Sequence, residues 1–564
     1  MWIPAAAILG GAVLWLVWAS IAEHVRGAAR LEAMRARWGQ PSSHPRDFEP
    51  LLRAHRALLE ASPRSGAIEE RTWRDLGMDD VYAHLDRAST FAGRVALYHR
   101  IRAPSRDLQA LRAFDATVNL FERDPPAREE VQRALGGMDE YGQAAILEAL
   151  FGEAPALAYG RFAYPVLAVA SALALVASLA SPVARVVAVG IGFGCIAVRV
   201  LLGRRTGAVL AFLDPLRRVH ALLRIGGALA ALRLPELEVQ LGALRPLLAR
   251  LGSLGRATSW LLLDASSVAE PVSLMVTYLN AFLLLDLTAL AFCLSALTGR
   301  RADLQALFVA VGDLDAALAV ASFRAGEPRV CRPELVPEAE TLAIEGAVHP
   351  LVARAVPNSV RVAERGLLIT GANMSGKSTF VRTVAINALL AQGLCVALAT
   401  SYRGPLVEVR TLMSASDDVQ RNRSYYAAEL AGAKELLAPC APGGRALVVL
   451  DELFRGTNTS ERIGAGKAVL EALQRAGHFV FASSHDLELV GLLDGRFDAY
   501  HFGEEVRGGE LAFPYTLRRG PSTTRNAIVL LELAGFPREV VADATAVAGA
   551  LDDRNRSRGG DALT

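Results

Sequence analysis

The sequence predicts a multidomain protein in which an α-helical, membrane-anchored N-terminal part precedes a C-terminal α/β domain with a phosphate-binding loop. Hydrophobic residues make up 52% of the 564-residue chain, and the mean hydropathy of +0.29 is high for an ordinary soluble protein. Long uncharged runs lie before residue 203, whereas short β-like runs alternate with helical segments from about residue 335. Such alternation is typical of a parallel sheet covered by helices.

Charge and cysteine content give no sign of a nucleic-acid-binding protein or of a cysteine-based metal site. Sixty basic and 58 acidic residues leave a formal net charge of +2, so no overall basic field indicates a nucleic-acid partner. The five cysteines have no C-x-x-C or other metal-ligand spacing, and we interpret them as buried thiols in a reducing compartment. Only Lys377, Lys434 and Lys467 among the basic residues are lysines, a bias typical of GC-rich bacterial genomes.

The first predicted membrane segment is the N-terminal helix 1–22. Residues 2–22 form an uncharged run long enough to span a bilayer. No basic residue precedes this run, which disfavours a cleaved signal peptide. Arginines follow it, so the positive-inside rule places the N-terminus outside and the following chain in the cytoplasm.

The second predicted membrane element is a helical hairpin over 162–202. It consists of two apolar runs, 162–180 and 183–202, joined by a turn at Ser181-Pro182. The arginines near its two ends would then be cytoplasmic, in agreement with the first helix. The alternative is a helical hairpin buried in a soluble core. We expect a multi-pass protein of a bacterial inner membrane, with lipid around the spans and the C-terminal domain in the cytoplasm.

A third apolar stretch, 272–297, is predicted to be a buried core helix because it carries Asp286 in its middle. A fourth span would also export the C-terminal domain, away from cytoplasmic nucleotide. The remaining chain divides by pattern into helical and mixed regions. These are a cytoplasmic helical region at 27–160, a second helical region at 204–334, an α/β domain at 335–550 with strands near 342–344, 367–369, 446–450 and 479–481, and a polar tail at 551–564.

A glycine-rich loop follows the predicted strand 367–369. Its pattern, G-x-x-x-x-G-K-S, stands between that strand and a predicted helix over 379–390. Glycines let backbone N–H groups curl around phosphate oxygens, and the helix N-terminus adds partial positive charge. We expect Lys377 to reach the β- and γ-phosphates of ATP and the Ser378 hydroxyl to bind Mg²⁺; the alternative is a turn without a ligand. The predicted phosphate-binding residues are Gly371, Ala372, Asn373, Met374, Ser375, Gly376, Lys377, Ser378 and Thr379.

Two acidic residues follow the apolar strand 447–450. The carboxyl ends of strands are where α/β sheets bind ligands. We therefore expect Asp451 to hold the Mg²⁺ shell and Glu452 to orient or deprotonate the attacking water. The alternative is a pair of solvated acids. His485 follows a further strand and could sense the γ-phosphate, although a lone histidine is more often structural.

These motifs resemble those of the MutS family of ATPases. The resemblance covers about 340–540 and implies the family's ABC-like domain. The matching segments are 370–379 (the family's TGPNMGGKST), 451–459 (its DEIGRGTST), 416–418 and 424–429 (its stretch between these two), 483–485 (its Ala-Thr-His) and 349–350 (its opening His-Pro).

The resemblance implies a dimeric, Mg²⁺-dependent ATPase with sites shared between subunits. Ser424 would complete the partner subunit's site by touching its γ-phosphate, and Asn458 would lie at the dimer interface. The family match also raises the expectation that His485 acts with Glu452 and Lys377 in catalysis.

Upstream, 76–102 and 313–323 resemble the start and end of the family's helical core. In the family, lever helices tipped with a DNA clamp interrupt this core. Here the hairpin 162–202 stands in that interruption, a layout similar to the membrane-bound MutS-related proteins of bacteria. We expect no mismatch-reading domain before residue 76.

Three functions are compatible with these motifs. The first is a membrane-anchored ATPase linked to DNA repair or to binding of mismatched DNA. The second is a membrane-coupled ATPase acting on lipid or a membrane protein without DNA. The third is a nucleotide-gated scaffold that hydrolyses slowly.

Overall fold

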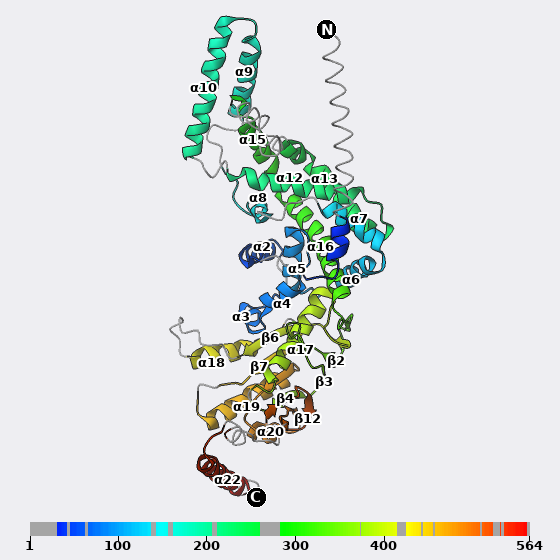
Figure 1. Ribbon diagram of the computed structural model, residues 1–564, viewed down its shortest axis with the longest axis vertical. Coiled ribbons are helices and arrows are strands. Elements are labelled where there is room, and N and C mark those ends of the chain that lie inside the picture. Colours follow the sequence, from blue (N-terminus) through cyan, green and yellow to red (C-terminus); the bar gives the residue numbers. More distant parts are fainter. Residues whose placement is uncertain are drawn as a thin grey trace. The chain divides into compact units, whose positions relative to one another are not determined.

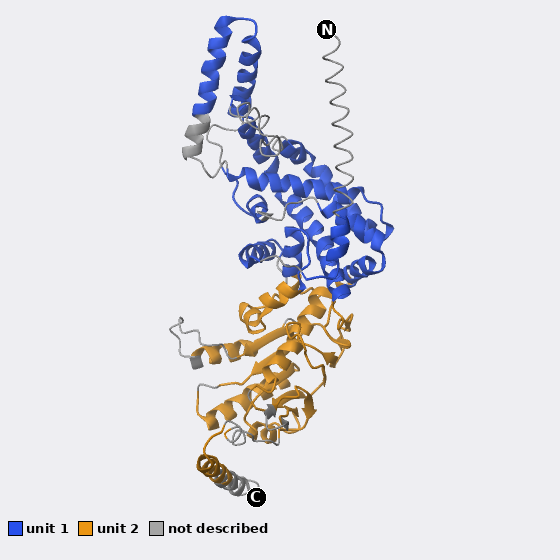
Figure 2. Ribbon diagram, in the orientation of Figure 1, with its two compact units in different colours: residues 1–63, 85–99, 112–326 blue, residues 64–84, 100–111, 327–564 orange. Residues whose placement is uncertain are grey.

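The computed structural model describes residues 31–41, 46–62, 66–136, 143–155, 162–205, 211–259, 282–372, 374–413, 425–440, 444–454, 457–507, 510–522, 531 and 535–560. The chain divides into two compact units, which Figure 2 shows in different colours. Unit 1 comprises 1–63, 85–99 and 112–326, and unit 2 comprises 64–84, 100–111 and 327–564. The predicted membrane helix 1–22 lies outside the described residues.

The described part of unit 1 is helical, as predicted for 27–160 and 204–334. Its longest helix, α16 (Arg301–Gly326), is the one described helix that is long and apolar enough to cross a membrane, but 78% of its apolar window is buried inside the protein. Such burial is typical of a core helix. The other helices, of which α5 and α6 extend into unit 2, are α2 (Phe48–Ala61), α5 (Phe91–Arg102), α6 (Leu108–Arg123), α7 (Pro125–Leu135), η1 (Gln143–Ala145), α8 (Ile146–Leu150), α9 (Ala163–Ala177), α10 (Pro182–Arg205), α12 (Leu213–Ala231), η2 (Pro235–Leu237), α13 (Glu238–Ser259) and α15 (Leu285–Leu297).

A buried carboxylate joins α16 to the start of α5. Asp315 accepts hydrogen bonds from the backbone N–H and the hydroxyl of both Ser89 and Thr90, at 2.7 to 3.2 Å. Burial raises the pKa of Asp315, and these four donors oppose that rise by stabilising the charged form. The helices also approach closely, because a Cβ on Gly312 would lie only 2.5 Å from the carbonyl oxygen of Ala92.

Helices α9 and α10 form the antiparallel hairpin predicted at 162–202 (Figure 1). The buried side chains of α9 are Tyr164 and Ser171. Ser171 donates to the carbonyl of Leu167 at 2.9 Å, and its Oγ lies 3.2 Å from Sγ of Cys195 on α10. The hairpin therefore buries polar and small side chains and exposes large apolar ones, the reverse of a soluble helix pair. The exposed set includes Val166, Val169, Leu173, Val176, Leu179, Val183, Val186, Val189 and Phe193.

The predicted core helix at 272–297 is described from residue 282 onward. There, α15 buries Leu287, Leu290 and Leu294 and packs against α13 and α9. Asp286 lies in its first turn, where the carboxylate accepts a hydrogen bond from the backbone N–H of Leu287 at 2.8 Å. A helix N-terminus stabilises a negative charge, so this acid does not disturb the apolar helix.

The larger sheet of unit 2 has six described strands in the order β12-β9-β4-β8-β7-β6. β4 pairs in parallel with β8 and β9, β7 pairs in parallel with β6 and β8, and β12 is antiparallel to β9. Burial on both faces explains the continuous apolar runs of β4, β7 and β8. The bounds are β4 (Gly366–Thr370), β6 (Val407–Met413), β7 (Arg445–Asp451), β8 (Phe479–Ser483), β9 (Phe497–Phe502) and β12 (Leu517–Arg519).

The rest of unit 2 comprises a smaller sheet, a hairpin and helices. The four-stranded sheet has the order β1-β5-β2-β3, and β10 pairs with β11. The polar tail 551–564 is helical as far as Gly560, because α22 continues through it. The bounds are β1 (Glu334–Leu335), β2 (Leu342–Ala347), β3 (Asn358–Val362), β5 (Ser401–Gly404), β10 (Glu505–Arg507), β11 (Glu510–Ala512), α3 (Glu70–Asp75), α4 (Met78–Leu85), α17 (Lys377–Leu394), α18 (Tyr425–Leu436), α19 (Thr459–Arg475), α20 (Glu488–Leu492) and α22 (Arg538–Gly560).

Unit 2 also contains a short upstream segment that the sequence assigned to the helical region 27–160. α3 lies against β6, where Asp75 accepts hydrogen bonds from the Thr411 hydroxyl at 2.7 Å and the Met413 N–H at 3.2 Å. Arg71 forms an ion pair of 2.8 Å with Glu435 of α18. These polar contacts join residues more than 300 positions apart in the sequence, so no local sequence pattern predicts them.

Candidate functional site

The phosphate-binding loop stands between the buried strand β4 and helix α17, as the sequence predicts. Gly371 and Gly376 have φ values of 138° and 108°, a backbone region that favours glycine. A Cβ on Gly371 would also lie 2.7 Å from the carbonyl oxygen of Phe502. Both glycines of the motif are therefore required by local geometry. The helix start at Lys377 presents backbone N–H groups and partial positive charge at the loop.

The side chain of Lys377 is buried against its own loop. Its Nζ donates to the carbonyl oxygens of Gly371 at 2.7 Å and Ala372 at 2.9 Å, and lies 3.9 Å from Oε1 of Glu452. Ser375 is fully buried, and its hydroxyl has no hydrogen-bond partner among the described atoms. A buried donor without a partner fits a loop that completes its hydrogen bonds on a phosphate.

The other predicted loop residues differ in exposure. Ser378 is half-buried, while Thr379 and Met374 are exposed. Met374 has a φ of 72°, an uncommon conformation for a residue other than glycine. Asn373 lies outside the described residues.

The predicted carboxylates stand at the carboxyl end of β7, next to the end of β8. Asp451 is the last residue of β7 and accepts a short hydrogen bond from the hydroxyl of Ser483, its partner in the sheet register. The backbone N–H of Glu452 donates to the Ser483 carbonyl at 3.1 Å. Oε2 of Glu452 lies 3.5 Å from Nδ1 of His485. The structure therefore brings Lys377, Asp451, Glu452 and His485 together.

The loop after Glu452 has a constrained backbone. Glu452 and Phe454 have φ values of 54° and 60°, and the N–H of Phe454 donates to Glu429 of α18 in a short hydrogen bond. Asn458 caps α19, because its side chain accepts from the N–H of Glu461 at 3.0 Å. This capping role was not predicted from the sequence. Ser424 lies outside the described residues.

A cavity of about 540 Å³ adjoins the phosphate-binding loop. Its size is within the range of small-molecule sites. Besides Lys377 and Glu452, it is lined by residues that the sequence did not single out as ligands, among them Val352, Asn358, Phe502 and Tyr515. Asn358 holds the Tyr515 segment, donating to the Tyr515 carbonyl at 2.9 Å and accepting from the Leu517 N–H at 2.7 Å.

His349 also lines this cavity. Burial, helped by the nearby positive charge of Arg382, lowers the pKa of His349 to about 4. The imidazole is therefore neutral at physiological pH. The sequence offered only the His349-Pro350 pair as a family resemblance, and no local signal marked Tyr515.

The residues present fit a magnesium–nucleotide complex. For phosphate, the loop offers backbone N–H groups, Lys377 and the buried Ser375 hydroxyl, which has no partner within the described part of the chain. Ser378 and Asp451 offer the oxygen ligands that Mg²⁺ prefers. The fold and this site are those of the P-loop nucleotide-binding proteins.

Comparison with known proteins specifies the class further. Residues 367–552 match the family MutS domain V. The DNA mismatch repair protein MutS of Thermus thermophilus is 34% identical over 246 residues, covering 43% of this chain and 29% of that protein. MutS of Roseiflexus sp. is 34% identical over 289 residues, covering 48% of this chain and 26% of that protein. MutS of Natronomonas pharaonis is 34% identical over 252 residues, covering 43% and 29%.

This chain thus spans less than a third of the length of these relatives. It carries MutS domain V, an ABC-like ATPase domain, and is distantly homologous to MutS over its C-terminal half.

Proposed function

We propose that the protein is a membrane-anchored, dimeric ATPase that binds and hydrolyses ATP with Mg²⁺. The observation that carries the enzymatic part is the convergence of Lys377, Asp451, Glu452 and His485 beside a cavity of suitable size. Lys377 would bind the β- and γ-phosphates, and Ser378 with Asp451 would hold the metal. When bound, Mg²⁺ neutralises charge that develops on the phosphate oxygens.

Glu452 and His485 act at the γ-phosphate end of the site. Glu452 is buried beside Lys377 and accepts a proton from the attacking water. His485 is half-exposed and orients Glu452 or the γ-phosphate through its ring nitrogens. Tyr515 and the neutral His349 form the part of the cavity that contacts the nucleoside.

Replacement of the catalytic carboxylate tests this assignment. Glu452→Gln is expected to lower kcat by about 10²- to 10⁴-fold while leaving ATP affinity nearly unchanged, because only the proton acceptor is lost. Lys377→Ala is expected to weaken ATP binding itself. Glu471→Gln, on α19 and not among the residues that line the cavity, is the control and should retain wild-type turnover. Wild-type turnover of Glu452→Gln would show that another group is the base.

The dimer part of the proposal rests on the resemblance of 424–429 and 451–459 to the MutS motifs. Ser424 would complete the partner subunit's site, and Asn458 would lie at the interface while also capping α19. Ser424→Ala and Glu452→Gln should each be inactive alone, but a mixed dimer has one site without a lesion. Absence of recovered activity in proven mixed dimers would contradict the shared site.

The membrane part of the proposal is supported by the hairpin of α9 and α10, which exposes large apolar side chains and buries small and polar ones. Small and polar residues between helices with apolar residues outside are typical of membrane proteins. The apolar part of α10, Pro182–Ala197, extends about 24 Å at 1.5 Å per residue, so the helix covers the ~30 Å hydrocarbon core only if Arg185 and Arg199 extend toward the two interfaces. The 15 residues of α9 extend only about 22 Å, so the turn residues must complete the crossing or the bilayer must thin locally.

Cysteine labelling distinguishes a crossing hairpin from one that enters only one leaflet. A cysteine introduced at Ser181, in the turn, should react with an impermeant reagent from outside intact cells. A cysteine at Ser253 should react only after permeabilisation. External labelling at Ser253, or a Ser181 label that requires permeabilisation, would contradict the three-span topology.

The link to DNA repair or mismatched DNA is proposed from homology alone, since the similar proteins are DNA mismatch repair proteins. Binding of the full chain to matched and mismatched duplexes, with and without ATP, tests it across a salt series. Phosphate contacts give a steep fall of affinity with salt. Absence of binding at low salt would favour a membrane-coupled ATPase or a scaffold, which ATP turnover in lipid against detergent then separates.

A further inference from the structure

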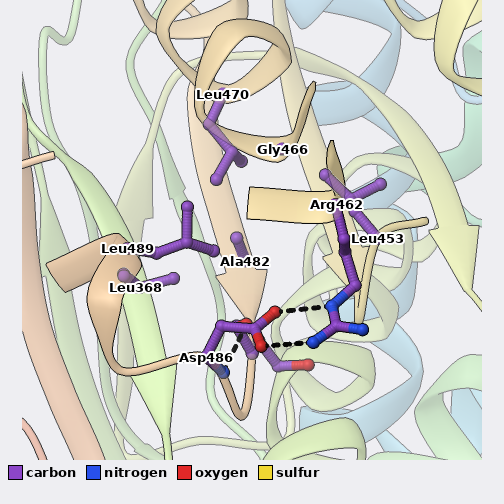
Figure 3. A pocket seen from close by; sticks show the side chains of 10 residues that line it. Leu368, Leu453, Arg462, Gly466, Leu470, Ala482, Asp486 and Leu489 are labelled. Carbon is purple, nitrogen blue, oxygen red and sulfur yellow. Dashed lines mark hydrogen bonds and ion pairs between the residues drawn. The ribbon is translucent and has the colours of Figure 1, made fainter. Parts of the chain in front are cut away.

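A largely buried ion pair lies next to the predicted catalytic loops. Arg462 Nη2 donates to Asp486 Oδ1 at 2.6 Å, and Arg462 Nε donates to Asp486 Oδ2 at 2.9 Å (Figure 3). The two side chains are only 15% and 8% exposed, and leucines line the small space around them. Such a bidentate pair fixes both the distance and the relative orientation of its partners.

Helix stability alone does not account for this arginine. α19 begins at Thr459, so Arg462 stands in the first turn, near the positive end of the helix. A cation there is unfavourable, because the helix N-terminus carries partial positive charge. The start of the helix is already capped, since the N–H of Glu461 donates to the Asn458 side chain. The Asp486 carboxylate compensates the charge. The position of the arginine is therefore best understood from the two segments that the pair joins.

The pair joins the two loops that carry Glu452 and His485. Arg462 follows the loop that begins at Glu452, and Asp486 directly follows His485 in the sequence. The backbone hydrogen bond from Glu452 to Ser483 is a second tie between the same loops. Within the second loop, the N–H of Asp486 donates to the Ser484 hydroxyl at 3.0 Å. The ion pair is thus a side-chain tie between the segments that carry the predicted catalytic groups, beside the backbone tie from Glu452 to Ser483.

The first loop needs such support because its backbone is strained. Left-handed φ values at residues such as Glu452 and Phe454 cost roughly 1–2 kcal/mol each for residues other than glycine. Such conformations persist only where the surrounding structure holds them. Removal of Arg462 would also leave Asp486 as an unpaired carboxylate 3.8 Å from Nε2 of His485, where it would compete with Glu452 for the imidazole.

We propose that Arg462 and Asp486 are positioning residues that set the placement of Glu452 relative to His485. Neither residue lines the nucleotide cavity, so they act on hydrolysis through these two groups and not on ATP binding. This inference rests on the proposed ATPase function. Loss of the pair lets the strained loop relax and moves the Glu452 carboxylate away from its working position.

The test compares single and double variants of the full chain in detergent with Mg²⁺ and ATP. Arg462→Gln and Asp486→Asn are each expected to lower kcat on the order of 10- to 100-fold, because small displacements of a catalytic group have effects of this size. KM and the dissociation constant of a fluorescent ATP analogue should change less than about threefold. The double variant loses the same tie and leaves no unpaired charge, so it should be no less active than the less active single variant and should not show the product of the two losses. Lys467→Met, which removes a pair with Glu471 on the same helix, is the matched control and should turn over like wild type.

The possible outcomes separate the positioning role of the ion pair from the proposed ATPase function. Wild-type kcat in both single variants would overturn the positioning role. A proportional loss of ATP affinity would also overturn it, because the pair would then be only structural, and so would additive losses in the double variant, because the two residues would then act independently. Absence of Mg²⁺-dependent turnover in the wild-type chain would instead refute the proposed function.

Discussion

Helix α17 of unit 2 and the hairpin of unit 1 are both rich in apolar residues, yet α17 buries its large apolar side chains and the hairpin exposes most of them. In α17, 15 of 18 residues are buried. In α9, the buried residues are a tyrosine and a serine, while most of its valines and leucines are exposed. Apolar composition therefore does not distinguish a core helix from a membrane helix. The environment of the large apolar side chains does, since both helices bury polar residues, such as Asn387 in α17 and Ser171 in α9.

The largest expected effect comes from placing the same charge in both helices. Leu389→Asp in α17, at a position 1% exposed, is expected to destabilise unit 2 by roughly 4 kcal/mol or more and to abolish ATP binding. Leu173→Asp in α9, at a position 66% exposed, should leave ATP binding and thermal unfolding in detergent unchanged. ATP-analogue binding and melting of both variants are the measurements.

The Leu173→Asp variant also tests whether the exposed face of α9 contacts lipid. In native membranes, Leu173→Asp should reduce external labelling at the Ser181 position, because a carboxylate within the hydrocarbon core disfavours insertion. Unchanged labelling would show that the exposed face does not contact lipid. Loss of ATP binding in Leu173→Asp would show that the face packs on protein.

A smaller effect is expected at the interface between the hairpin helices. Ser171→Leu places a larger apolar side chain where Ser171 meets Cys195, and overpacking of this kind costs about 1–3 kcal/mol. Val169→Leu makes a similar enlargement on the exposed face and should cost nothing measurable. Protease resistance of the hairpin in detergent compares them. Equal resistance of the two variants would mean that α9 and α10 do not pack as a close pair.

Local patterns were sufficient to predict the centre of the ATPase domain. The apolar runs of β4, β7 and β8 and the glycine-rich loop between β4 and α17 lie where the sequence placed them. Continuous apolar strands and a phosphate loop depend on residues close together in the sequence. The placement of Asp451 and Glu452 at a strand end follows from the same local information.

Contacts between distant residues were not predicted. The hydrogen bonds from Asp75 to β6, the Arg462–Asp486 pair and the position of Tyr515 beside Gly376 all depend on how the strands are ordered. The sheet order β4-β8-β7-β6 cannot be read from any single segment. Polar side chains scattered through helices and loops resemble solvated residues until the tertiary structure brings their partners together.

The smallest expected effect concerns His349, a polar group that the ATPase unit partly buries. Because burial lowers the pKa of His349 to about 4, its ring should stay neutral across the range in which nucleotide binds. The histidine resonance that disappears in His349→Gln identifies this residue by NMR. Its titration should have a midpoint near 4, well below the ~6.5 of a solvated imidazole.

The sign of the linked stability change follows from these two values. Between about pH 6.5 and pH 4 the unfolded chain binds a proton at His349 that the folded chain does not bind, so the free energy of unfolding falls as the pH is lowered. His349→Gln lacks this contribution, whereas every other group titrates alike in both proteins. Lowering the pH from 7 to 5 should therefore reduce the melting temperature of the wild type more than that of His349→Gln. An equal decrease, or a titration midpoint near 6.5, would show that the partial burial of His349 and the charge of Arg382 do not lower its pKa.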